Sequence, residues 1–255
     1  MPGNVMRASA ALLALGAFAY TAWALEAFLR TGLDPVRTYV SELAASDQPF
    51  GAFFRATDLL AGALVLAGAV LGRAATRASG PAAPGRRRRP RPDGEGGRAG
   101  RVREPWALLG WGALALFGAA TVADSRLPLS CAATVDPACA AREAAGLVPA
   151  THTAHAVSSG LAMTCALVAL VALAVAARRH GPRRPLARTG LVVVALELAA
   201  TVWTLAAVAA FEAGRGSWAL GAGQRLQVLL VAVWLAVLAC SLATSRPAPE
   251  PERLR

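Results

Sequence analysis

The sequence carries little charge for its length. Only 16% of its 255 residues are charged, and no lysine occurs, so all 26 basic residues are arginine. A soluble domain of this size usually carries about 25% charged residues. Hydrophobic residues make up 56% of the chain and occur in long runs. The combination indicates an integral membrane protein.

The sequence also lacks the short motifs that would assign a reaction. It contains no GxxxxGK phosphate-binding loop, no CxxC pair and no HExxH metalloprotease motif. The alternation of polar and apolar residues that is typical of barrel strands is missing from the apolar runs. Helices are therefore the expected spanning elements, because they satisfy their backbone groups internally.

Six apolar segments reach the length of about 20 residues that a spanning helix needs. Apolar residues occur on every side of each segment, so each helix is expected to face lipid or another helix all round. The segments are about 8–28, 53–71, 106–123, 153–177, 189–211 and 226–243. We therefore predict an all-α polytopic integral membrane protein, a single six-transmembrane-helix bundle over residues 1–255.

The first segment also has features of a signal peptide. Arg7 supplies a short basic start, and Ala22-Trp23-Ala24 resembles a cleavage site. Five more spans follow, however, so an uncleaved first helix is the simpler interpretation.

Arginines are distributed unevenly between the two faces that six spans create. With the N-terminus inside, the inner segments hold 19 of the 26 arginines, and the formal charge is +14 inside and −2 outside. Cytoplasmic loops of membrane proteins carry such an excess of basic residues. We predict a multi-pass protein of the cell membrane with both termini in the cytoplasm.

The segment 73–105 is rich in arginine, glycine and proline, which predicts a disordered cytoplasmic loop. Such a loop can contact anionic lipid head groups, at about 1 kcal/mol per arginine near the surface. No aromatic residue interleaves the arginines, so nucleic acid is not an expected partner. Membrane lipids are the expected partners, and the oligomeric state stays open.

Cys131 and Cys139 lie in a predicted outer loop. The exterior is oxidising, which favours a disulfide that closes this short loop, with two free thiols as the alternative. A metal pair is disfavoured because the C-x7-C spacing is longer than that of common zinc ligand pairs. Cys165 and Cys240 fall inside predicted spans and are interpreted as packing residues.

Ionisable residues gather at the predicted outer ends of the helices. His152 and His155 are three residues apart, so on a helix their rings share one face, and Ser159 continues that face one turn deeper. The acids at the same level are Glu26, Glu42, Asp58 and Asp124. Such a mixture suits an open zinc site. It equally suits an ion-paired lid, and the two histidines alone could simply meet water and head groups.

Glu197 is the one acid well inside a predicted span. It comes nine residues after Arg188, which places it about 13 Å deep at about 1.5 Å per residue. A carboxyl group at that depth usually faces the bundle interior or a cavity. Thr201 and Thr204 continue its face outward. The stripe predicts either one wall of a polar funnel or a structural hydrogen bond to a neighbouring helix.

The order of several motifs resembles one family. The motifs are YVSELAASDQPFGAFFRATDLLAG after the first span, an Asp closing the third, HAVSSG opening the fourth and GAGQRLQVLLVAVW opening the sixth. In this order they resemble the domain-of-unknown-function family 998 (DUF998) of six-span bacterial and archaeal membrane proteins. Gln224 stands where that family has a glutamate, while Arg225 and Trp234 match.

The resemblance covers the chain apart from the arginine-rich loop, and it implies a six-helix bundle without an established activity. It does not extend to His152, which weakens a site built on two histidines. The shared polar positions that it implies are Ser41, Glu42, Asp58, Asp124, His155 and Arg225.

These observations predict an outward-facing polar pocket that includes Ser41, Glu197 and Arg225, and they leave three functions open. In a metal-dependent intramembrane hydrolase, Asp124, His155 and His152 would hold zinc, and Glu42 or Asp58 would move protons. In a small-solute or proton-coupled transporter, Glu197 would titrate and Arg225 would guard the outer mouth. In a non-catalytic protein, the polar face would bind a lipid or a partner.

Overall fold

The computed structural model describes residues 2–78, 105–179 and 185–244, and every regular element in these ranges is helical. Six of the helices are long and apolar enough to cross a membrane. The prediction of an all-α polytopic bundle is thereby confirmed. The elements are α1 (Pro2–Ala19), η1 (Ala22–Ala27), η2 (Val40–Ala44), α2 (Gly51–Ala78), α3 (Pro105–Asp124), α4 (Pro137–Ala144), α5 (Ala150–Arg179), α6 (Pro185–Glu212) and α7 (Leu220–Ala243).

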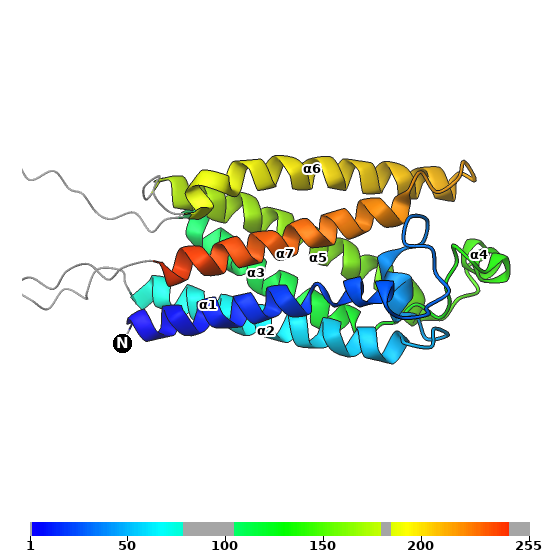
Figure 1. Ribbon diagram of the computed structural model, residues 1–255, viewed down its shortest axis with the longest axis horizontal. Helices are drawn as coiled ribbons and strands as arrows, with labels where there is room; N and C mark the ends of the chain where they lie inside the picture. The colour runs from blue at the N-terminus through cyan, green and yellow to red at the C-terminus, as the bar shows by residue number, and fades with distance from the viewer. Residues whose placement is uncertain (1, 79–104, 180–184, 245–255) are drawn as a thin grey trace, which may run out of the picture.

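The six long helices form a closed ring. In the cyclic order α1, α2, α3, α5, α6, α7, each helix packs against the next, and α7 packs against α1. Figure 1 shows them running side by side along the long axis, with the N-terminus at one end and α4 at the other. We call the end that carries α4, η2 and the connection between α6 and α7 the lid end.

The first and second spans differ from their predicted bounds. The α-helix α1 ends at Ala19, because the Thr21 amide and hydroxyl both donate to the Phe18 carbonyl (3.1 and 2.7 Å) and tighten the chain into the 3-10 helix η1. Helix α2 continues past Leu71 to Ala78, since no glycine or proline follows Gly72 within it. The predicted disordered loop was therefore wrong for its first residues, and residues 79–104 lie outside the described ranges.

The short helix α4 was not predicted, although its start signal is present in the sequence. Asp136 caps the helix by accepting a hydrogen bond from the Ala138 amide (2.9 Å), and Pro137 occupies the first turn. Both residues are favoured at these positions of a helix. The 8-residue helix lies within the connection between α3 and α5.

Large side chains fill the bundle away from the lid end. Phe117, Leu170 and Trp234 are fully buried and belong to one apolar cluster with side chains from all six long helices. The outward faces carry exposed apolar side chains such as Phe18 and Val192, as expected for helices that face lipid. Toward the lid end the ring is hollow and encloses a cavity of about 550 Å³.

A polar cavity beneath a disulfide-braced lid

The cavity lies between the lid-end turns of the long helices, with η1, η2 and the connection between α3 and α5 closing over it. Most of the predicted site residues reach it, although they come from four separate stretches of sequence. The predicted residues that line it are Ser41, Glu42, Asp58, Asp124, His152 and His155.

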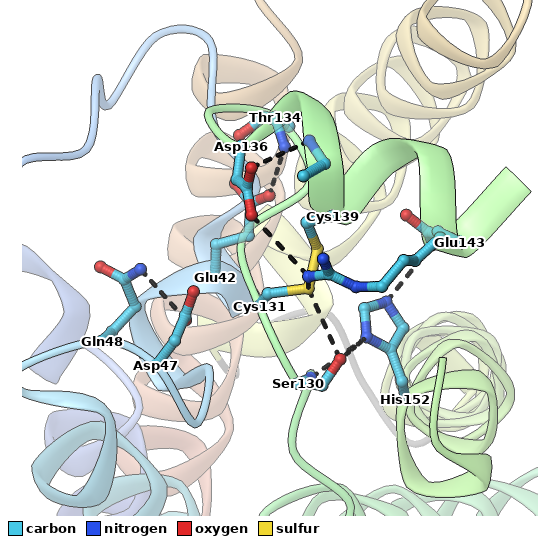
Figure 2. Close-up of a disulfide and its surroundings, with 12 residues drawn as sticks. Glu42, Asp47, Gln48, Ser130, Cys131, Thr134, Asp136, Cys139, Glu143 and His152 are labelled. Atoms are coloured by element: carbon cyan, nitrogen blue, oxygen red, sulfur yellow. Dashed lines mark hydrogen bonds and ion pairs between the residues drawn. A yellow bond between two sulfur atoms is a disulfide. The ribbon is translucent and has the colours of Figure 1, made fainter. Parts of the chain in front are cut away.

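A disulfide braces the connection between α3 and α5, which we call the lid. Cys131 and Cys139 are bonded, with their Cα atoms 6.1 Å apart, and the bond ties the chain after α3 to helix α4. Figure 2 shows this bond beside Ser130, Glu143 and His152. Cys131 and Glu143 also line the cavity, so the braced segment forms part of its roof.

Glu42 fastens the lid to η2. Its side chain is fully buried and accepts hydrogen bonds from the Thr134 amide (2.8 Å), the Thr134 hydroxyl and the Tyr39 amide (3.0 Å). Burial raises the pKa of the Glu42 carboxyl, and the hydrogen bonds from Thr134 and Tyr39 oppose this shift. Both carboxyl oxygens are occupied, which favours an anchoring role for Glu42 over the predicted proton transfer.

His155 is held by groups on two helices. Its Nδ1 lies 2.9 Å from the Leu127 carbonyl oxygen and 3.2 Å from Asp124 Oδ1. A carbonyl oxygen can only accept, so Nδ1 carries the proton and the neutral ring presents a lone pair at Nε2. Ser159 Oγ lies 3.3 Å from Nε2 and also donates to Asp124 Oδ2 (2.9 Å). A base, a carboxylate and a hydroxyl are thus in contact at the cavity wall.

His152 uses its ring nitrogens the other way round, and both of them contact residues of the lid. Its Nδ1 accepts a hydrogen bond from the Ser130 amide (3.1 Å), so the proton of the neutral ring is on Nε2. That Nε2 lies 3.4 Å from Glu143 Oε1, as Figure 2 shows. Although His152 and His155 are one turn apart on α5, they contact different partners.

The predicted zinc ligands do not come together as a set. Asp124 contacts His155, but His152 is engaged by Ser130 and Glu143. Within the described residues, no three His, Cys, Asp or Glu side chains lie close enough to hold a metal ion. The donors that are present therefore do not fit a zinc centre, and the chemistry of the site is considered from the side chains themselves.

Asp58 differs from the other acids of the cavity. It lies on α2, it is half-buried, and it lines the cavity. Across the described ranges, no other group donates a hydrogen bond to its carboxylate. Asp58 is thus the cavity carboxylate that is free to meet a bound molecule.

Two predicted pocket residues lie apart from the cavity. Arg225 is buried and pairs with Glu26 through two hydrogen bonds (2.6 and 2.7 Å), while its Nη1 donates to the Thr38 carbonyl (2.9 Å). Glu197 is 1% exposed and is not among the lining side chains. Its Oε2 has no hydrogen-bond partner in the described structure. Glu197 therefore does not line a polar funnel, and Arg225 does not line the mouth of the cavity.

Some cavity residues were not among the predicted site residues. Trp23 and Thr204 line the cavity, and both Trp23 Nε1 and Thr204 Oγ1 are buried without a hydrogen-bond partner in the described ranges. Thr204 had been placed only on the stripe of Glu197, and Trp23 only near a possible cleavage site. Aromatic residues at the end of a span are common at the membrane interface, so the sequence did not distinguish Trp23 from such an anchor.

The comparisons with known proteins identify a family but no activity. A family model described as "Protein of unknown function (DUF998)" matches residues 12–86 and 97–241, which include every helix that lines the cavity. Neither the curated proteins nor the solved structures gave a match.

Proposed function

This chain belongs to the DUF998 family of proteins of unknown function, and from its cavity we propose that it binds an amphipathic, lipid-like molecule. The observation that carries the proposal is the division of the cavity wall. Asp58, His155 and Ser159 lie on its polar side, whereas Leu167 and Val228 belong to its apolar walls. A volume of about 550 Å³ falls within the range of about 300–1,000 Å³ that ligand sites usually have.

The side of the ring between α5 and α6 supports entry from the bilayer. Gly160 and Thr164 on α5 and Leu205 on α6 line the cavity and are exposed. A Cβ atom at Gly160 would meet no other group within 4 Å. An acyl or alkyl chain could therefore pass between these helices while its head group remains at the polar side.

Substitution of Gly160 by phenylalanine should weaken ligand binding at least tenfold, because the ring would occupy the opening between α5 and α6. The matched control is Val157→Phe on the same helix, since Val157 is 70% exposed and does not line the cavity. Native mass spectrometry of the purified protein would measure the alkyl amphiphiles that each variant retains. Equal retention by both variants would argue against this cavity as the binding site.

A second candidate function rests on the contact among Ser159, His155 and Asp124. Ser159 Oγ lies 3.3 Å from His155 Nε2, and the Asp124 carboxylate holds Nδ1. This is the order of groups in a serine nucleophile with a histidine base and an orienting carboxylate. The Ser159 proton is donated to Asp124 Oδ2 in this structure, so the hydroxyl would have to rotate before His155 could accept that proton. Ser159 Oγ would attack an ester carbonyl, His155 would take its proton and pass it to the leaving alcohol, and water would release the acyl group.

If the protein is such a hydrolase, His155→Ala should slow ester cleavage by about 100- to 10,000-fold, as expected for loss of a general base. Ser159→Ala should abolish both turnover and labelling by a fluorophosphonate probe. Thr164→Ala is the control, because Thr164 lines the same cavity while its hydroxyl bonds to the Gly160 carbonyl (2.8 Å). Unchanged turnover in Ser159→Ala would remove the catalytic candidate and leave the binding proposal intact.

The orientation that the arginines predict fits the position of the disulfide. The Cys131–Cys139 bond lies at the lid end, because Cys139 belongs to α4, and disulfides persist in oxidising compartments. The opposite end leads into the arginine-rich segment. We propose that the lid end faces the exterior and that both termini are cytoplasmic; a fluorescent protein fused after Arg255 that failed to fluoresce would contradict this.

A further inference from the structure

The charges around the cavity have one sign. Its lining holds the carboxylates of Glu42, Asp58, Asp124, Glu143 and Glu212. No arginine of the described ranges belongs to that lining, although arginines outnumber acids in the chain by 26 to 15. A low-dielectric cleft lined by one sign of charge concentrates ligands of the opposite sign. The cavity thus disfavours an anionic head group such as a phosphate or a carboxylate.

Three arginines at the lid end contact other groups of the protein. Arg142 Nη2 on α4 lies 3.5 Å from Cys131 Sγ and 3.8 Å from Asp136 Oδ2. Arg225 donates to both oxygens of Glu26, and Arg55 donates from Nη1 to the Ala44 carbonyl (2.6 Å). None of these three side chains lines the cavity. Among the described residues, the cavity lining therefore offers an anion no guanidinium group.

Among the five carboxylates, Asp58 is the half-buried one that lacks a hydrogen-bond donor in the described ranges. Glu42 and Asp124 accept hydrogen bonds within the protein, and Glu143 contacts His152. Glu212 is exposed at the end of α6. Asp58 is half-buried and receives no hydrogen bond from any group in the described ranges, so a cationic ligand would gain most by contact with it.

Aromatic rings accompany this carboxylate. Phe54 lies one helical turn from Asp58 on α2, and Tyr20 and Trp23 line the same cavity. Aromatic faces attract ammonium groups, including quaternary ones, and the attraction strengthens where water is excluded.

An independent observation indicates that the cavity is built for a ligand. Thr204 is 7% exposed, it lines the cavity, and its hydroxyl has no hydrogen-bond partner in the described structure. The same is true of the buried Trp23 Nε1. Buried polar groups are seldom left unpaired, so a bound molecule with polar atoms would satisfy them.

We infer that the ligand is a cationic amphiphile, an alkyl or acyl chain that carries an ammonium head group, with the ammonium placed between Asp58 and the rings of Phe54, Tyr20 and Trp23. This inference rests on the proposed binding function and adds the charge of the head group. The apolar chain extends toward the opening between α5 and α6.

The test uses the full-length protein in nanodiscs of neutral lipid and three ligands with the same alkyl chain: tetradecyltrimethylammonium, tetradecanol and tetradecyl sulfate. The ammonium ligand should bind the wild-type protein best, and Asp58→Asn should weaken its binding at least tenfold while leaving tetradecanol binding unchanged. Asp58→Glu should retain the preference. Comparison between variants in identical nanodiscs removes the contribution of partition into lipid.

Asp47→Asn is the matched control, because Asp47 is exposed and does not line the cavity. Equal binding of the ammonium and the alcohol, or an unchanged ammonium affinity in Asp58→Asn, would overturn the inference and leave the binding function standing. Stronger binding of the sulfate would overturn it as well. If none of the three ligands binds, the proposed binding function itself fails.

Discussion

Replacement of Arg225 by alanine should destabilise the folded protein by about 3–5 kcal/mol, the range expected when one partner of a buried ion pair is removed. The guanidinium and the Glu26 carboxylate are 7% and 5% exposed and are joined by two hydrogen bonds. Arg225 also donates to the carbonyls of Thr38 and Gly221. Its loss leaves a buried carboxylate and the Thr38 carbonyl without these donors, and it weakens the attachment of α7 to the chain between η1 and η2, where the Ala222 amide still donates to the Val36 carbonyl (3.3 Å).

The measurement is the fraction of purified protein that stays folded in a mild detergent as the temperature or the denaturant concentration is raised. Arg225→Lys should recover only part of the stability, because an ammonium group cannot reproduce the planar two-point contact with Glu26. Arg37→Ala is the control: its pair with Asp34 is exposed, at 3.6 Å, and should contribute less than about 1 kcal/mol. Equal losses in Arg225→Ala and Arg37→Ala would contradict the structural assignment.

The second large effect is expected from Gly118→Ala, at about 1–3 kcal/mol or more of destabilisation from overpacking. A Cβ atom at Gly118 would lie 2.6 Å from the Leu66 amide nitrogen and 2.8 Å from the Gly62 carbonyl oxygen. Both obstacles are backbone atoms, so relief requires α2 and α3 to separate. Small residues allow such close approach of helices in membranes.

Gly112→Ala on the same helix provides the comparison. The nearest atom to a Cβ at Gly112 is Arg73 Nη1 at 4.0 Å, and alanine is the better helix former by about 1 kcal/mol. Gly118→Ala should therefore lower the unfolding midpoint in detergent, whereas Gly112→Ala should raise it or leave it unchanged. A Gly118→Ala protein as stable as the wild type would show that α2 and α3 are not in this close contact.

The class of fold could be read from composition and the lengths of the apolar runs. A spanning segment has to be long, apolar and internally hydrogen-bonded, and these requirements leave a strong local signal. The exact ends were less predictable. The turn at Thr21 depends on local hydrogen bonds that hydropathy does not record, and α2 continues through Arg73 and Arg77 because charge alone does not end a helix.

The sequence indicated only part of the cavity lining: the predicted pocket residues Glu197 and Arg225 lie apart from it, and Trp23 was not expected in it. Ser41, Glu42, Asp58, Asp124 and His155 were singled out, and all of them line the cavity. Their partners come from distant parts of the chain: the Thr134 amide bonds to Glu42 across 92 residues, and Arg225 reaches Glu26 across 199. Charge and hydrogen-bonding type are visible in a sequence, whereas the partner that satisfies each group is not.

The sequence by itself determined that this chain forms six apolar helices with arginines at one end and acids and histidines at the other, because hydropathy and charge act locally along the chain. Only the tertiary structure decided which polar groups are satisfied and which remain free. Closing the helices into a ring used Arg225, Glu26 and Glu42 in internal contacts. Among the described residues, no group donates a hydrogen bond to Asp58, which lines the cavity together with Tyr20, Trp23 and Phe54. Packing decides this, because it sets which groups become neighbours in the folded chain.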